Sequence, residues 1–121
     1  MKRDMELIRQ ILLAIEAHKD MKQKIKLEIE DYSEEQIMYH VKILADAGLI
    51  EAIDVSSYEG ICFIPQCLTW SGHEFLDAIR NETVWKQTKE IVKDKGGSLP
   101  FEVLKSLAIE LAKKVVGGGY F

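Results

Sequence analysis

The sequence predicts an α+β fold in which a helix, a strand, a second helix, a β-hairpin and further helices follow one another. Three observations support this prediction. Apolar residues recur at helical spacing in several segments, they alternate with charged residues in another, and one helix carries sequence signals at both of its ends. The length of 121 residues fits one domain with a substantial core.

The first helix is expected over residues 4–18, with Asp4 as its N-cap. Its apolar stripe consists of Met5, Ile8, Ile11, Leu12 and Ile15. Residues 24–30 then read KIKLEIE, in which apolar and charged residues alternate. Because successive side chains of a strand point to opposite faces, this period of two predicts a short, half-buried strand.

The second helix is marked at both ends. Ser33 and Gln36 have the spacing of a capping box, and Gly48 suits the left-handed residue that follows a helix. Leu49 is placed to contact Leu44, an apolar contact that commonly accompanies such a helix end. The sequence therefore predicts a helix from residue 33 to 47 with Ile37, Val41 and Leu44 facing inward.

A β-hairpin is expected next, with strands at residues 50–56 and 61–68 and a turn at 57–60. Thr69 is expected to cap a further helix whose inward residues are Trp70, Phe75, Leu76 and Ile79.

Two more helices are predicted at residues 84–95 and 99–116, the last ended by the glycines 117–119. We expect residues 1–80 to form a core and residues 81–121 a helical extension of the same compact unit. The last helix carries the apolar stripe Leu104, Leu107, Leu111 and Val115. This stripe is expected to form a homodimer interface, and packing onto the first helix is the alternative.

Composition narrows the function classes. No apolar run approaches the roughly 20 residues that span a bilayer, and no signal peptide is evident, so we expect a cytoplasmic protein without a membrane partner. Cys62 and Cys67 are expected to be half-buried free thiols.

The sequence contains no glycine-rich phosphate loop, nucleophile elbow or HExxH pattern. We therefore expect no enzyme activity, no cofactor and no metal.

Two stretches carry a resemblance to known families. YHVKILADAGLI resembles the end of the recognition helix and the start of the wing in arsenical-repressor-type regulators. LTWSGHEFL resembles the segment that leaves the wing in multiple-antibiotic-resistance-type regulators. The resemblance implies a winged helix-turn-helix-like domain with two additional C-terminal helices. Only residues 19–31 separate the first helix from Ser33, so the first helix of the helix-turn-helix is expected to be shortened or absent.

The whole chain, from MKRDMELIR to LPFEVLKSLAIELAKK, also resembles the family catalogued as domain of unknown function 2513. This resemblance implies a winged-helix-like fold and a phage or prophage context. It implies no activity, because none is assigned to the family.

One functional hypothesis is a dimeric transcription regulator that binds duplex DNA through the helix that Ser33 opens. Its outward residues are expected to be Glu35, Gln36, Tyr39, His40 and Lys42. Gln36 suits adenine, Lys42 suits guanine or a phosphate, and Tyr39 suits a phosphate. Lys24 and Lys26 would contact the flanking backbone, and Tyr58 would lie at the tip of the wing.

The charge distribution supports a different hypothesis. The net charge is −4, and residues 31–60 carry seven Asp or Glu against Lys42 alone. Glu34 and Glu35 suit the positive end of a helix dipole but repel DNA. The alternative is therefore an adaptor or an inhibitor of a host protein whose winged helix does not bind DNA, including one whose acidic face mimics DNA.

Overall fold

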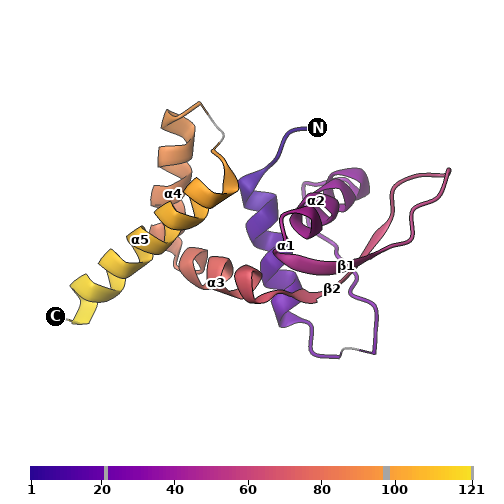
Figure 1. Ribbon diagram of the computed structural model, residues 1–121, viewed down its shortest axis with the longest axis horizontal. Helices are drawn as coiled ribbons and strands as arrows, with labels where there is room; N and C mark the ends of the chain where they lie inside the picture. Colours follow the sequence, from indigo (N-terminus) through magenta and orange to yellow (C-terminus); the bar gives the residue numbers. More distant parts are fainter. Residues whose placement is uncertain (21, 97–98, 121) are drawn as a thin grey trace. The chain divides into compact units, whose positions relative to one another are not determined.

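The computed structural model describes residues 1–20, 22–96 and 99–120, and it is of the α+β class (Figure 1). The described residues form five helices and one two-stranded antiparallel sheet. The elements are α1 (Met5–Ala17), α2 (Glu34–Asp46), β1 (Ile50–Asp54), β2 (Phe63–Leu68), α3 (Trp70–Ile79), α4 (Glu82–Asp94) and α5 (Phe101–Tyr120). They make two compact units, Met1–His73 and Glu74–Phe121, and α3 contributes to both. The division expected at residue 80 stays a prediction.

Helix α1 begins as predicted. The Asp4 side chain accepts a hydrogen bond from the Leu7 amide at 3.1 Å, so Asp4 is the N-cap. The buried face of α1 consists of Leu7, Ile8, Ile11, Leu12 and Ile15, and Met5 is half-buried beside it. This face packs against α2 and β2.

Helix α2 has both predicted ends. The Ser33 hydroxyl accepts from the Gln36 amide at 3.1 Å, and the Gln36 side chain accepts from the Ser33 amide at 2.9 Å. At the other end Gly48 has φ +76°, and the Leu49 amide donates to the Leu44 carbonyl at 3.0 Å. These bonds satisfy backbone groups that a helix end leaves without intrahelical partners. Local sequence alone therefore determines where α2 starts and stops.

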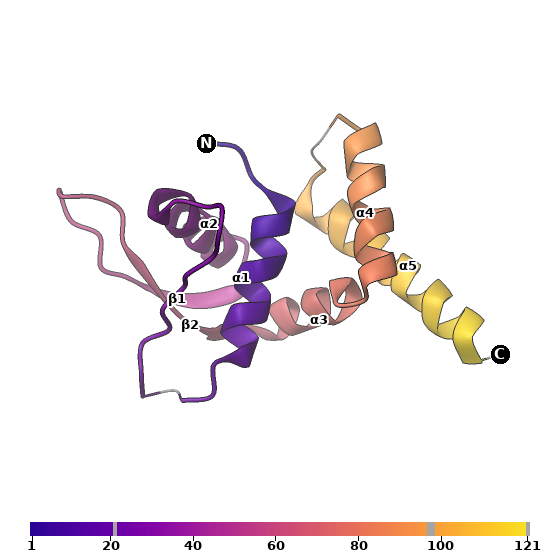
Figure 2. The ribbon, with the colours of Figure 1, turned by 180° about the vertical axis from the view of Figure 1, so that it is seen from behind.

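The hairpin has the predicted position but shorter strands. Ile50 pairs with Leu68 and Asp54 with Phe63, and the register shifts by one residue after Glu51. Ser57 and Gly60 exchange backbone hydrogen bonds of 3.0 and 3.1 Å and close the turn. The loop beyond the strands projects away from α1 and α2, as both views of the ribbon show (Figures 1 and 2).

The strand predicted at residues 24–30 is wrong, although its burial pattern is right. Ile25, Leu27 and Ile29 are half-buried and their charged neighbours are exposed. Yet these residues belong to no sheet, and none of the backbone groups of residues 24–29 hydrogen-bonds to another described residue. The segment has the side-chain alternation of a strand without a hydrogen-bonded neighbour.

The outer edge of β2 explains why the segment is unpaired. The Phe63 amide points away from β1 and donates to the Met38 sulfur at 3.0 Å. Alternate residues of a strand offer their backbone groups to the same edge, so Pro65 is the next to face outward. Proline has no amide hydrogen. At Phe63 and Pro65 the outward edge of β2 thus offers no free amide donor to a third strand.

Helix α3 is attached to the end of α2. The Thr69 amide donates to the Leu49 carbonyl at 3.0 Å, and the Thr69 hydroxyl donates to the Gly48 carbonyl. The same hydroxyl accepts from the Gly72 amide at 3.1 Å, which confirms Thr69 as the cap of this helix. The buried residues include Phe75, Leu76 and Ile79 as predicted. The prediction that Trp70 faces inward is wrong, because 81% of it is exposed.

The C-terminal unit contains the end of α3 together with α4 and α5, and the last two helices contact each other. Asn81 caps α4 by accepting from the Thr83 and Val84 amides at 2.8 and 3.1 Å. Val84, Trp85 and Val92 are buried on α4, and Leu104 and Ala108 are buried on α5. The prediction that glycines 117–119 end the last helix is wrong, because α5 continues to Tyr120.

Gly72 provides a test of the junction between α2 and α3. A Cβ atom there would clash with the Leu49 carbonyl oxygen, a backbone atom that cannot rotate away. We expect Gly72→Ala to lower the free energy of unfolding by about 1 to 3 kcal/mol, although alanine normally favours a helix over glycine. Urea denaturation measures the change, with Glu74→Ala, an exposed position of the same helix, as the control. Equal stability of the two variants would contradict this packing.

Candidate interaction surfaces

Helix α2 has few polar side chains free for a partner. Glu35 is exposed, whereas Gln36, Tyr39 and Lys42 are half-buried. The Gln36 side chain is engaged in the capping box, and the Lys42 ammonium pairs with Asp46 at 3.0 Å. The residues expected to read DNA bases therefore already have intramolecular partners.

His40 lies inside the structure, so its predicted outward orientation is wrong. Only 1% of it is exposed. The Asp4 amide donates to Nε2 at 2.8 Å, and Nδ1 lies 2.7 Å from the Gln36 carbonyl oxygen. Because the amide can only donate, Nε2 must accept, which places the ring hydrogen on Nδ1. His40 thus joins the start of α1 to the middle of α2.

Tyr32 extends the same contact to the chain before α2. Its hydroxyl donates to Asp4 at 3.1 Å. Burial and the nearby Asp4 carboxylate raise the pKa of Tyr32, so the hydroxyl stays protonated and remains a donor. Asp4 therefore caps α1, receives Tyr32 and contacts His40 through its backbone. Asp4 and His40 are 36 residues apart, and no local pattern in the sequence indicates their contact.

The hairpin exposes apolar side chains. Tyr58 is fully exposed, and Ile53, Val55 and Ile61 are 51%, 47% and 55% exposed. We call these four residues the hairpin patch. The charged residues of the hairpin, Glu51, Asp54 and Glu59, are all acidic. Hydrogen bonds from Ser56 lower the pKa of Asp54, which keeps that carboxylate ionised.

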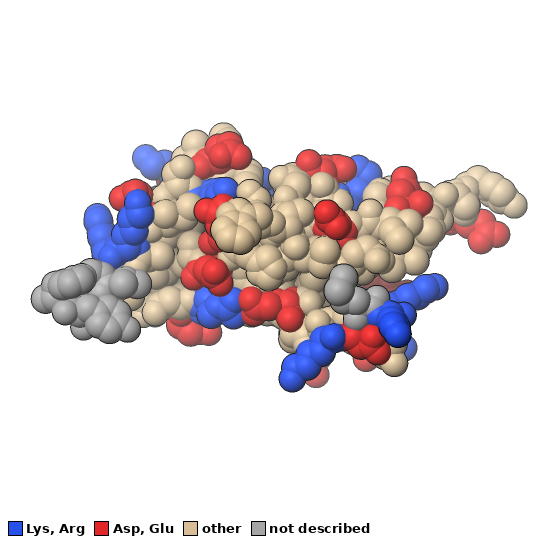
Figure 3. All heavy atoms as spheres, turned by 60° about the horizontal axis from the view of Figure 1, so that its bottom comes forward, with Lys and Arg blue, Asp and Glu red and all other residues tan. Residues whose placement is uncertain are grey.

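Positive charge is missing from this part of the sequence. Residues 43–79, which include the hairpin, contain no Lys or Arg and six Asp or Glu. Of the lysines proposed to contact DNA, Lys24 and Lys26 are exposed, and Lys26 pairs with Glu28 at 3.3 Å. The third, Lys42, lies close enough to the hairpin to help lower the pKa of Asp54. On the face drawn in Figure 3, basic and acidic side chains are interspersed.

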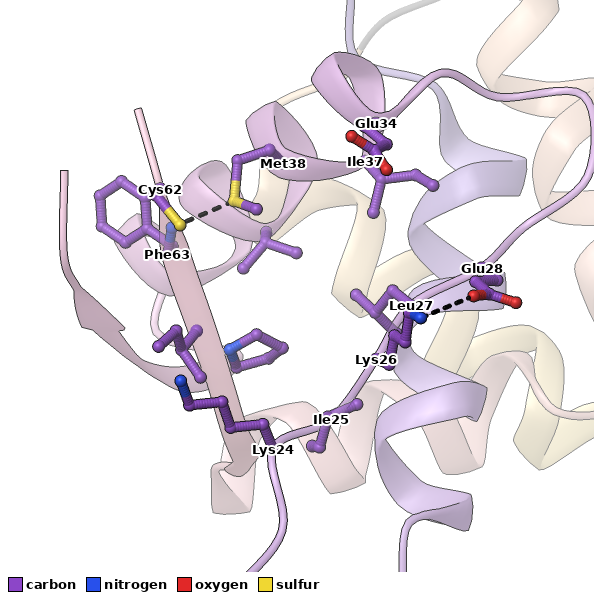
Figure 4. A pocket seen from close by; sticks show the side chains of 13 residues that line it. Lys24, Ile25, Lys26, Leu27, Glu28, Glu34, Ile37, Met38, Cys62 and Phe63 are labelled. Carbon is purple, nitrogen blue, oxygen red and sulfur yellow. Dashed lines mark hydrogen bonds and ion pairs between the residues drawn. The ribbon is translucent and has the colours of Figure 1, made fainter. Parts of the chain in front are cut away.

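A groove separates residues 24–28 from the hairpin (Figure 4). Residues 24–28 form one wall, residues 62–65 form the other, and α2 contributes Ile37, Met38 and Val41. Its volume is about 330 Å³. Sequence reasoning missed this groove because it predicted that residues 24–30 would pair as a strand.

Comparison with known proteins identifies one family for this chain. Residues 2–98 match the family described as "Hypothetical protein (DUF2513)". The chain belongs to the DUF2513 family. This DUF2513 chain is also 42% identical over 109 residues to an "Uncharacterized protein" of Haemophilus influenzae, covering 89% of the chain and 92% of that relative. No solved structure matches it.

The predicted dimer stripe of the DUF2513 chain is partly occupied. Leu104 is 2% exposed, whereas Leu107, Leu111 and Val115 are half-buried. Leu104 therefore packs within the chain, and the other three keep some surface for a partner.

The cysteines are free and half-buried, as predicted. The Cys67 thiol lies 3.5 Å from a Glu51 carboxylate oxygen, and burial together with this carboxylate raises the pKa of the thiol.

No group of three or more His, Cys, Asp or Glu side chains in the described part of the DUF2513 chain is arranged to hold a metal ion. No helix among the described residues is both long and apolar enough to cross a membrane.

The buried histidine can be tested by substitution. His40→Ala would leave the Asp4 amide without its acceptor and would remove the contact of Nδ1 with the Gln36 carbonyl oxygen, so we expect a loss of about 1 to 3 kcal/mol in the free energy of unfolding. His73, an exposed histidine, supplies the matched control, and His73→Ala should change stability by less than about 0.5 kcal/mol. Urea denaturation measures the free energy of unfolding of both variants. Equal losses in the two would show that the His40 contacts contribute little to stability.

Proposed function

We propose that this chain is a protein-binding domain, an adaptor or an inhibitor of a host protein, built on a winged-helix-like fold. The observation that carries the proposal is the exposed hairpin patch in a region without Lys or Arg. The phage or prophage context implied by the family resemblance is compatible with a host protein as the partner.

The order of elements supports the winged-helix-like part of the proposal. A helix, α2, lies directly before a projecting hairpin, and α3 follows it, as in winged-helix domains. None of the described residues between α1 and α2 forms a helix, which fits a helix-turn-helix whose first helix is shortened or absent. A recognition helix without this companion lacks the element that normally crosses the DNA backbone.

The composition of the hairpin favours a protein partner. Exposed aromatic and aliphatic side chains on one projecting element are typical of surfaces that bind proteins. Tyrosine adds a hydroxyl that can hydrogen-bond within such an interface. Tyr58 at the tip, with Ile53, Val55 and Ile61, meets this description.

Electrostatics disfavour DNA at the same surface. Neutralisation of phosphates by Lys and Arg supplies most non-specific affinity for DNA. The hairpin offers none of these residues and adds Glu51, Asp54 and Glu59, which would repel phosphates. The same acidic character suits a partner with a basic surface, including one that normally binds nucleic acid.

A dimeric DNA-binding regulator is the second candidate. The exposed lysines Lys22, Lys24 and Lys26 favour it, since they precede α2 and could contact phosphates. The half-buried residues Leu107, Leu111 and Val115 would then contribute to a homodimer that pairs two half-sites.

Photo-crosslinking distinguishes the two candidates. A benzoylphenylalanine placed at Tyr58 in cells that carry the native gene should form an adduct of discrete mass with a protein. The same group at Glu90, an exposed position on α4, is the control and should not form it. Ile53→Ser together with Ile61→Ser should reduce the adduct severalfold, because the partner loses its apolar contacts.

Two outcomes would contradict the proposal. One is an adduct with nucleic acid from Tyr58 or from the same group placed at Glu35, which would favour the regulator. The other is a protein adduct of equal yield from Tyr58 and Glu90, which would show random collision rather than a specific surface.

A further inference from the structure

The groove beside the hairpin has an unusual wall. Residues 24–29 alternate in burial like a strand, and their backbone groups have no hydrogen-bond partner among the described residues. Unpaired backbone donors and acceptors in this alternating arrangement are a template for another strand. At about 3.3 Å per residue, six such residues offer roughly 20 Å of edge.

The opposite wall cannot complete this ladder by itself. Pro65 has no amide hydrogen, and the Phe63 amide donates to the Met38 sulfur. A thioether is a weak acceptor, and methionine is a flexible side chain. The backbone carbonyl of an incoming chain would be a stronger acceptor for the Phe63 amide. Such a carbonyl could therefore displace the Met38 sulfur from this amide.

The interior of the groove suits side chains rather than a folded element. Its volume of about 330 Å³ is near the lower end of the range for ligand pockets. Ile25, Leu27, Ile37 and Val41 make much of its lining apolar. An extended segment that directs every second side chain inward could fill it with two or three apolar groups.

The rim adds a charge preference. Lys24 is exposed and has no ion-pair partner in the described residues, whereas Lys26 already pairs with Glu28. An acidic side chain at the Lys24 end would therefore gain an ion pair without breaking one. Glu34, exposed at the start of α2, also lines the groove and would repel an acidic residue placed beside it.

We propose that this groove binds an extended peptide segment of a partner protein, which adds to residues 24–29 as a strand. The segment carries apolar residues at alternate positions and an acidic residue opposite Lys24. The inference rests on the proposed function in that the ligand is again a protein, but it concerns a surface separate from the hairpin patch.

The test uses random dodecapeptides displayed on phage and selected against the full chain. The enriched sequences should share apolar residues two positions apart with Asp or Glu at one end. Labelled synthetic copies should bind with saturation in fluorescence anisotropy. N-methylation of the peptide at successive positions should weaken binding at every second residue only, because only alternate amides of a strand face the ladder.

Substitutions in the chain locate the site. Lys24→Glu, at an exposed position, should weaken binding by roughly three- to tenfold, and exchange of the peptide's acidic residue for lysine should restore it. Ile25→Arg should abolish binding by filling the groove, provided that the variant keeps its helical circular dichroism. Tyr58→Ala should leave peptide affinity unchanged, which separates this site from the hairpin patch.

Three results would overturn the inference. The first is that no peptide is enriched above an unrelated immobilised protein. The second is binding that responds to Tyr58→Ala but not to Lys24→Glu, which would transfer the peptide to the hairpin patch and leave the proposed function intact. The third is a dimer, detected by light scattering, that does not bind peptides and that Ile25→Arg dissociates. That result would mean that a second copy of the chain occupies the groove.

Discussion

The close approach between Gly72 and the Leu49 carbonyl determines how the N-terminal unit is arranged. Helix α2 ends at Gly48, the chain turns into β1, and Thr69 returns from the hairpin to donate to the carbonyls of Gly48 and Leu49. A side chain at residue 72 would prevent this contact. The two sequence stretches that resemble winged-helix regulators are therefore two sides of a single junction. The junction residues in these stretches determine where the hairpin starts and where it returns. Their presence therefore does not by itself indicate DNA binding.

Two consequences follow for interaction with partners. The hairpin extends from this junction with apolar side chains exposed at its outer part, where a DNA-binding wing would carry lysine or arginine. Behind it, β2 presents an outward edge with Pro65 and with Phe63 bonded to Met38, so residues 24–29 have no backbone partner in the described part of the chain. The hairpin patch and the groove both have properties that favour protein partners, one through apolar side chains and the other through unpaired backbone.

Local signals in the sequence were sufficient where the structure depends on neighbouring residues. The capping box of Ser33, the glycine stop at Gly48 and the cap at Thr69 are all found as predicted. Two of the failures arise from contacts between distant residues. The burial of His40 depends on Asp4, and the missing strand at residues 24–30 depends on the edge chemistry of β2. Periodicity reports which side chains face inward, but it contains no information on whether a neighbouring strand can donate hydrogen bonds. The groove was missed for the same reason.

Hydrogen exchange of the free chain, resolved by residue in NMR spectra, tests the central claim that a strand-like segment is left without a partner. The account predicts that the amides of residues 24–29 exchange at nearly the rate of an unstructured peptide, because they have no acceptor among the described residues, while those of Val41 and Leu44 in α2 are strongly protected. Protection of residues 24–29 comparable to that of the β1–β2 ladder would contradict it. Such a result would mean that the third strand is already paired and that the groove is closed.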